Sequence, residues 1–171
     1  CIFVNDTADA GTIRQLAGLP GIVGIKDSSG DLAYFSQLLA LAREVRPDWS
    51  LLIGPEHLLV ESLRLGGHGG VHGGANLRPR LLVELYEAAR REDAAALARL
   101  QPVLARLGEI YRVGRHASAI IKGMKCALAL MGICDDFMAE PFARFQEPER
   151  SRVRAILTDL MQSENSKQGL V

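Results

Sequence analysis

One lysine, Lys26, stands where the sequence could perform carbonyl chemistry. It follows a short apolar, β-branched run, residues 22–25, which predicts a buried strand. Because side chains alternate along a strand, Val23 and Ile25 share one face and Lys26 lies on the other. If helices cover the Val23 and Ile25 face, the lysine points into the space that the sheet encloses. Desolvation there disfavours an ammonium ion, and the neutral amine is a nucleophile towards carbonyl carbon.

The alternative is that Lys26 only ends the strand and extends its amine to water. Two features favour the nucleophile. Gly24 lies two residues earlier on the same face and leaves space beside the amine. In addition, the chain carries its positive charge almost entirely as arginine, and its lysines are Lys26, Lys122, Lys125 and Lys167.

A second strand is predicted over residues 50–54, and Gly54 ends it. Glu56 and His57 follow at the same edge of the sheet. Glu56 is compatible with two roles that do not exclude each other. It can begin a helix, where the helix dipole favours an acid, and it can contact a substrate held at the strand ends.

Glycines dominate a third predicted strand, residues 69–74. A phosphate-binding loop is rejected, because its Gly-x-Gly-x-x-Gly pattern would have to follow a strand and open a helix. Small residues within a strand instead let a helix or a ligand come close. The missing side chains of Gly73 and Gly74, at the end of this strand, permit such an approach.

The histidines of this region raise the question of a metal site. Residues four apart on a strand are separated by ~13 Å, so His68 and His72 cannot both reach one zinc ion at ~2.1 Å per ligand without converging loops. We therefore predict no metal site. By alternation with Val71, His72 faces the enclosed side of the sheet and is a candidate contact with substrate.

Helical patterns separate the predicted strands at short spacing. This order predicts a parallel sheet with helical crossovers, in which chemistry gathers at the C-terminal strand ends. After residue 91 only helical patterns remain. Segment 117–131 is apolar on nearly all faces and is expected to be buried. The expected helices are one through Leu16 and Ala17 capped by Asp9 or Thr12, Leu32–Val45 capped by Asp31, 55–65, 79–91, 93–113, 117–131 and 149–161.

Composition argues against several other classes of protein. The net charge is zero, with 20 basic and 20 acidic residues interleaved, and no basic patch indicates a nucleic-acid partner. No apolar run reaches the ~18 residues that span a membrane, and the N-terminus lacks the features of a signal peptide. Cys126 and Cys134 are expected to be reduced core thiols. These observations predict a cytosolic (cytoplasmic) protein.

Four segments resemble the dihydrodipicolinate synthase / N-acetylneuraminate lyase family. Residues 21–31, Gly-Ile-Val-Gly-Ile-Lys-Asp-Ser-Ser-Gly-Asp, resemble the strand that bears its Schiff-base lysine. Residues 52–56, Leu-Ile-Gly-Pro-Glu, resemble its seventh strand, and residues 69–76, Gly-Gly-Val-His-Gly-Gly-Ala-Asn, its eighth. Residues 121–133 resemble its C-terminal helical region.

Members of this family are (β/α)8 barrels in which a lysine on the sixth strand condenses with pyruvate or another 2-keto acid. The resemblance implies an α/β fold: strands six to eight of a TIM barrel with their helices over residues 1–91, then a three-helix C-terminal region over 92–171. It implies a class I aldolase-type lyase that forms a covalent imine through Lys26 without a separate cofactor. It also implies a homo-oligomer. The implied substrate contacts are Gly54, Glu56, His72, Gly73 and Gly74.

With 171 residues, the chain is short for a complete barrel, which typically needs ~250. The resemblance begins after the family's fifth strand, so the half that carries its carboxylate-binding loop and catalytic tyrosine is not matched. Tyr34, Tyr86 and Tyr111 fall on predicted helices and do not match that tyrosine. We therefore expect the isolated chain to be inactive and to self-associate through open sheet edges. The alternative function is a non-catalytic half-barrel that acts only as a structural or assembly unit.

Overall fold

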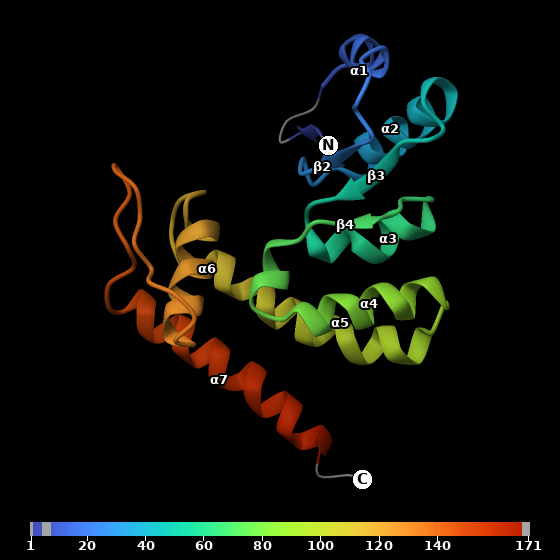
Figure 1. Cartoon of the computed structure of the whole chain (residues 1–171). Coiled ribbons are helices and arrows are strands. Elements are labelled where there is room, and N and C mark those ends of the chain that lie inside the picture. The colour runs from blue at the N-terminus through green and yellow to red at the C-terminus, as the bar shows by residue number, and fades with distance from the viewer. Residues whose placement is uncertain (1, 5–7, 169–171) are drawn as a thin grey trace. The chain divides into compact units, whose positions relative to one another are not determined.

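The computed structural model describes residues 2–4 and 8–168 and places them in two compact units (Figure 1). The first, here called the sheet unit, comprises Cys1–Gly73 and Leu82–Ala94. The second, the helical unit, comprises Gly74–Leu81 and Ala95–Val171. The division between domains predicted at residue 91 stays a prediction.

The sheet unit contains a parallel sheet of four strands in the order β1-β2-β3-β4. The α/β architecture predicted from the sequence is therefore confirmed. The strands are β1 (Ile2–Val4), β2 (Gly24–Asp27), β3 (Ser50–Ile53) and β4 (Gly69–Gly70). The elements between and after them are α1 (Ala10–Ala17), α2 (Leu32–Val45), the 3-10 turn η1 (Glu56–Leu58), α3 (Leu59–Arg64), the 3-10 turn η2 (Gly73–Asn76) and α4 (Pro79–Arg90).

Aspartate side chains cap the N-termini of the first two helices. Asp9, one of the two caps predicted for α1, accepts a hydrogen bond from the Thr12 backbone N–H (3.0 Å). Asp31 accepts from two backbone N–H groups of the first turn of α2, and the bounds of α2 are those predicted. Such caps satisfy amide groups that have no partner within the helix.

The core of the sheet unit forms on one face of the sheet. Ile25, Leu51 and Ile53 alternate along β2 and β3 to that face and are 0–2% exposed. Helix α2 buries Phe35 and Leu38 in the same unit and packs against both α1 and α3. The alternation places Lys26 on the opposite face, as the sequence predicts.

The strand predicted over residues 22–25 begins two residues later than expected. The Ile22 carbonyl accepts hydrogen bonds from Trp49 Nε1 (2.9 Å) and Arg46 Nη2 (3.1 Å). These side chains thus bind a carbonyl oxygen that would otherwise accept a backbone hydrogen bond from a neighbouring strand. Val23 is 60% exposed. The prediction that Val23 shares the buried face of Ile25 is wrong, because the regular alternation starts only at Gly24.

The sheet has a fourth strand and a much shorter last strand than predicted. Ile2–Val4 form β1, which is not among the three predicted strands. The strand predicted over 69–74 is limited to Gly69 and Gly70, and the chain then turns into η2. Glycine has no side chain to pack against neighbouring strands, which explains why this segment does not extend the ladder.

The helix predicted over residues 55–65 is divided into two parts. Pro55 has extended backbone angles (φ −65°, ψ 119°) and precedes η1, and α3 follows from Leu59. Gly66, at φ +100°, lies just after α3, in a conformation that glycine adopts without strain.

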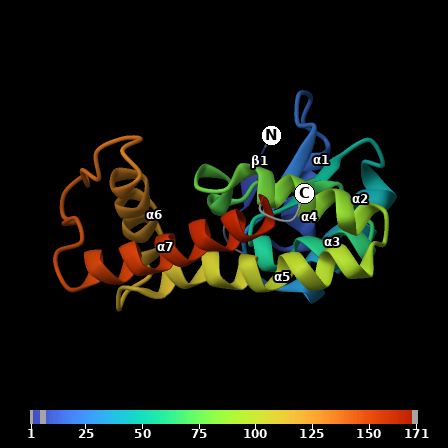
Figure 2. The same ribbon diagram turned by 90° about the horizontal axis from the view of Figure 1, so that it is seen from below.

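The helical unit is built from the three helices predicted for the C-terminal region. They are α5 (Ala94–Gly108) with its 3-10 extension η3 (Glu109–Arg112), α6 (Ala119–Leu130) and α7 (Glu149–Gln168). Helix α7 runs beside the C-terminal part of α5 (Figure 2), where Arg106 pairs with Glu109 and Asp159. Helix α6 packs so closely on η3 that a side chain at Gly123 would overlap the Ile110 carbonyl. Among the helices of the described residues, none is long and apolar enough to cross a membrane.

Three expectations for this unit are wrong. Helix α6 is not buried on all faces: Ile120 and Ile121 are 49% and 57% exposed, and one stripe is buried, formed by Ala119, Gly123, Cys126 and Ala127. Helix α7 continues to Gln168 rather than ending at residue 161. Cys126 is a buried thiol as predicted, but Cys134 is exposed, because it lies beyond the end of α6.

Candidate active site

Lys26 lies in the middle of the sheet, near the C-terminal end of β2. Its backbone is in register with Phe3 of β1 and Leu52 of β3. A β-carbon added to Gly54 would stand 3.0 Å from Lys26 Cε. The lysine stem therefore runs along the backbone of Gly54, immediately after β3, and only glycine leaves it this space.

Ser28 contributes a buried hydroxyl at the same place. Its Oγ would lie 2.6 Å from that added β-carbon of Gly54, so Lys26 and Ser28 face the same glycine. The Ser28 hydroxyl is buried and has no hydrogen-bond partner. A buried polar group without a partner costs about 1–3 kcal/mol, which marks it as a group available to a ligand.

The backbone around Lys26 is held by short hydrogen bonds. The Gly54 N–H donates to the Asp27 carbonyl oxygen (2.6 Å), which joins the end of β3 to the end of β2. The Asp27 carboxylate is fully buried and accepts from the Ser29 N–H (2.8 Å) and the Ser29 hydroxyl (3.1 Å). Asp27 therefore braces the loop after Lys26.

His72 bonds to the same glycine from the other side. Its Nδ1 lies 2.8 Å from the Gly54 carbonyl oxygen, and its Nε2 is buried without a partner. Burial lowers the pKa of His72, and the positive charge of Lys26 acts in the same direction, whereas the bond to Gly54 and the charge of Glu56 oppose the shift. The interactions place His72, Lys26 and Glu56 in one electrostatic neighbourhood.

The remaining predicted contacts lie at the same strand ends or follow them. Glu56 is 7% exposed. It is the first residue of the 3-10 turn η1, as expected for an acid at the start of a helix. Gly73 and Gly74 begin the 3-10 turn η2 rather than ending a strand. Gly73 belongs to the sheet unit and Gly74 to the helical unit. Their contact with substrate, like that of Glu56 and His72, stays a prediction.

Two features of the site differ from the sequence-based expectation. Gly24 does not make space for the lysine, because a side chain there would overlap the Ser50 backbone; Gly54 has that role instead. Ser28 was not among the predicted site residues, although it stands two residues after Lys26 and thus on the same face of the chain if the extended backbone continues. That spacing was the signal that could have identified it.

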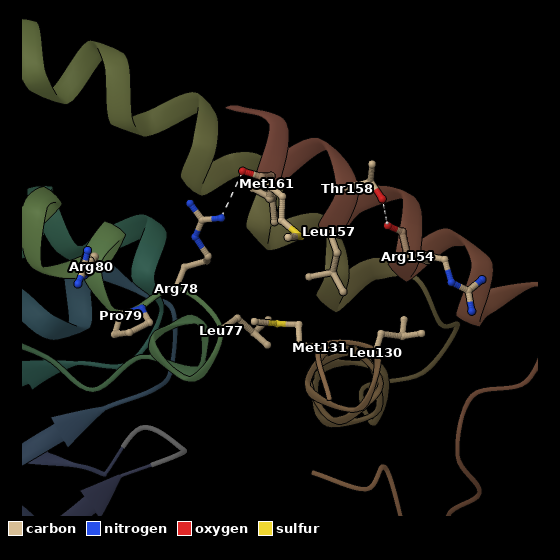
Figure 3. A pocket seen from close by; sticks show the side chains of 11 residues that line it. Leu77, Arg78, Pro79, Arg80, Leu130, Met131, Arg154, Leu157, Thr158 and Met161 are labelled. Atoms are coloured by element: carbon tan, nitrogen blue, oxygen red, sulfur yellow. Dashed lines mark hydrogen bonds between the residues drawn. The ribbon is translucent and has the colours of Figure 1, made fainter. Parts of the chain in front are cut away.

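A cavity lies within the helical unit. It has a volume of about 720 Å³ and is bordered by the start of α4, the end of α6 and one side of α7 (Figure 3). Leu77, Met131 and Leu157 point into it, and Arg78 lies at its edge, where it donates to the Leu160 carbonyl (3.2 Å). No group of three or more potential metal ligands occurs among the described residues.

The parallel sheet with helical crossovers and functional groups at its strand ends defines an α/β protein of the type found in (β/α)8 barrels. The model of the dihydrodipicolinate synthetase family matches residues 7–160. The chain belongs to this family, as the resemblance of its strand segments predicts.

Individual relatives support the same placement. The 4-hydroxy-tetrahydrodipicolinate synthase of Methanospirillum hungatei is 30% identical over 146 residues, which are 85% of this chain and 48% of the relative. A probable 2-dehydro-3-deoxy-D-pentonate aldolase of Escherichia coli is 30% identical over 139 residues, 80% of this chain and 45% of the relative. The solved dihydrodipicolinate synthase of Bacteroides thetaiotaomicron is 43% identical with a TM-score of 0.81, and the match covers 91% of this chain and 52% of that one. The chain thus spans about half the length of the relatives it matches.

Proposed function

We propose that this chain provides the nucleophile of a Schiff-base-forming lyase or aldolase, which acts on pyruvate or a related 2-keto acid. Membership of the dihydrodipicolinate synthetase family supports an enzyme of this type. The observation that carries the proposal is the placement of Lys26: it lies near the C-terminal end of a parallel strand, with its Cε against Gly54 and the unpartnered Ser28 hydroxyl beside the same glycine.

In the proposed reaction, the neutral Lys26 amine attacks C2 of the keto acid and a C–N bond forms. The former keto oxygen takes up two protons and leaves as water, which gives a protonated imine. The imine withdraws electrons, so C3 loses a proton and an enamine results. The enamine then attacks an aldehyde to form a C–C bond; in the reverse direction this bond breaks. Water finally adds to C2, restores the keto group and frees the amine.

The neighbours of Lys26 suit a small oxygen-rich substrate. The Ser28 hydroxyl is available to donate to a carboxylate or hydroxyl oxygen of the bound acid. Glu56 and the backbone of Gly54, Gly73 and Gly74 are the further contacts that we propose. The imine is covalent, so the proposal needs no separate cofactor.

We further propose that β2, β3 and β4 correspond to strands six, seven and eight of a barrel, and α5 to α7 to its C-terminal region. We infer that none of the three tyrosines is the family's proton-transfer group, because they lie on α2, α4 and η3. Tyr34, for example, lies on α2 and exchanges hydrogen bonds with the backbone of Ala8 (3.2 Å). We infer that this group comes from the other half of a barrel, so the isolated chain is inactive.

The test compares two proteins: the 171-residue chain alone, and the whole chain joined to the preceding half of the Bacteroides thetaiotaomicron relative, here called the completed barrel. Each is incubated with pyruvate and borohydride, and the adduct is mapped by mass spectrometry. We expect a label on Lys26 in the completed barrel, its loss in Lys26→Gln, and no loss in the control Lys122→Gln.

A label on Lys122 or Lys125 would overturn the assignment of the nucleophile. A folded completed barrel that takes no label would instead favour the non-catalytic half-barrel. Sedimentation of the same samples tests the self-association of the chain alone and the homo-oligomer expected from the family. The cytosolic location stays a prediction from composition.

A further inference from the structure

Two histidines flank β4; through their Nδ1 atoms, His68 bonds to β3 and His72 to Gly54, the residue that follows β3. Before β4, His68 Nδ1 accepts a hydrogen bond from the Leu51 backbone N–H (3.0 Å). After β4, His72 Nδ1 lies 2.8 Å from the Gly54 carbonyl oxygen. Because β4 itself is two residues long, the two side chains extend its attachment to β3 in both directions.

The partners of these nitrogens determine where the ring hydrogens are. A backbone N–H can only donate and a carbonyl oxygen can only accept. His68 Nδ1 must therefore be unprotonated, and His72 Nδ1 must carry a hydrogen. Since burial lowers the pKa of His72, its ring is neutral near pH 7 and its Nε2 is bare.

The bare Nε2 of His72 is buried and has no hydrogen-bond partner. An apolar side chain of similar size would avoid leaving a buried acceptor without a donor. The feature that a histidine offers here, and an apolar residue does not, is therefore the Nδ1–H group that binds Gly54.

The Gly54 peptide is held on both sides. Its N–H donates to the Asp27 carbonyl (2.6 Å), next to Lys26 in β2, and its carbonyl accepts from His72. Lys26 Cε lies against this same glycine. A change at His72 would release one of the two attachments while leaving the sheet hydrogen bonds between β2 and β3 in place.

We propose that His72 is a positioning residue for Lys26, which acts by holding the Gly54 carbonyl through Nδ1–H and so fixing the backbone that supports the lysine stem. The role is indirect, in contrast to the substrate contact expected from the sequence. It rests on the proposed function in that Lys26 is taken as the nucleophile.

Three variants of the completed barrel separate positioning from general stability. In His72→Asn, the amide nitrogen stands at the place of Nδ1 and can still donate to Gly54. In His72→Leu, a side chain of nearly the same shape as asparagine cannot. His68→Leu is the matched control, because it removes the equivalent bond at the opposite end of β4, away from the C-terminal strand ends.

Two reagents measure the reactivity of the Lys26 amine. Formaldehyde with cyanoborohydride methylates any accessible lysine amine, whereas pyruvate with cyanoborohydride labels it only through the proposed imine. We expect His72→Leu to slow pyruvate labelling about tenfold and to change the pH profile of methylation of Lys26. His72→Asn should stay within about twofold of the parent protein, and His68→Leu should label Lys26 at the parent rate.

The outcomes distinguish the two proposals. If pyruvate labels none of the proteins but His72→Leu still alters methylation of Lys26 and His72→Asn does not, the proposed function fails and the positioning role stands. If pyruvate labels every variant at the parent rate, the function stands and the positioning role is overturned. An equal decrease in the rate of pyruvate labelling in His72→Asn and His72→Leu would also overturn the positioning role. Nitrogen-15 NMR of the parent protein should show Nδ1 protonated and Nε2 bare in His72; the opposite tautomer would contradict the argument.

Discussion

Replacement of Gly54 by alanine tests the geometry of the Lys26 site most directly. The added β-carbon would lie 2.6 Å from Ser28 Oγ and 3.0 Å from both Lys26 Cε and the Asp27 carbonyl oxygen. Non-bonded carbon atoms prefer separations of about 3.5–4.0 Å. The lysine stem must therefore move by about 0.5–1 Å, because the backbone carbonyl on the other side cannot yield as easily.

The expected effect is much larger on reactivity than on stability. Overpacking of this kind typically destabilises a protein by about 1–3 kcal/mol, whereas a displacement of about 1 Å at a reacting group can slow a reaction about a hundredfold. We expect Gly54→Ala in the completed barrel to fold, with a lowered melting temperature, and to form the pyruvate adduct on Lys26 about a hundredfold more slowly.

The assay is the rate of the borohydride-trapped adduct on Lys26, followed by mass spectrometry, beside thermal unfolding. Trp49, the chain's one tryptophan, is 1% exposed in the sheet unit and reports its unfolding by fluorescence. Gly108→Ala is the control, since an added β-carbon there meets no atom within 4 Å and the backbone is helical (φ −62°). Adduct formation in Gly54→Ala at the parent rate would refute the reasoning, because the lysine would then not depend on this glycine.

Two further predictions concern stability. Ala127 is fully buried on α6, so Ala127→Asp should lower the free energy of unfolding in urea by about 3–5 kcal/mol, as expected for an unpaired buried charge. The control Ala98→Asp, on the exposed side of α5, should change that free energy little. Equal melting temperatures of the two variants would contradict the packing of α6. Burial also lowers the pKa of His72, so the unfolded chain takes up a proton first as the pH falls below about 6.5. The contribution of His72 is therefore present above that pH and lost below it, and the parent protein should lose more unfolding free energy between pH 7.5 and 5.5 than His72→Asn; parallel losses would show that His72 titrates normally.

Local sequence signals predicted most of the secondary structure because the relevant forces are local. Asp31 caps α2 where its position before an apolar helical pattern indicates. The alternation of Leu51 and Ile53 identifies the buried face of β3. The placement of Lys26 on the opposite face follows from the same period of two.

Features that depend on distant residues were predicted poorly. Ile22 and Val23 have strand-forming side chains, but Arg46 and Trp49, more than twenty residues later, bind the Ile22 carbonyl. The exposure of Ile120 and Ile121 depends on what packs against α6, which its own apolar composition does not specify. Gly54 meets Lys26 and Ser28 only because two strands end side by side, so the segment around Lys26 contains no signal for this contact.

The place of the His72 ring also has a consequence for sequence variation. Because the ring occupies the position that a side chain at Gly70 would take, any other residue at 70 would displace the ring and break its bond to the Gly54 carbonyl. We therefore expect positions 70 and 72 to vary together. In homologous sequences, a histidine at the position of His72 should occur with glycine two residues earlier, and lineages that gain a larger residue there should lose the histidine as well.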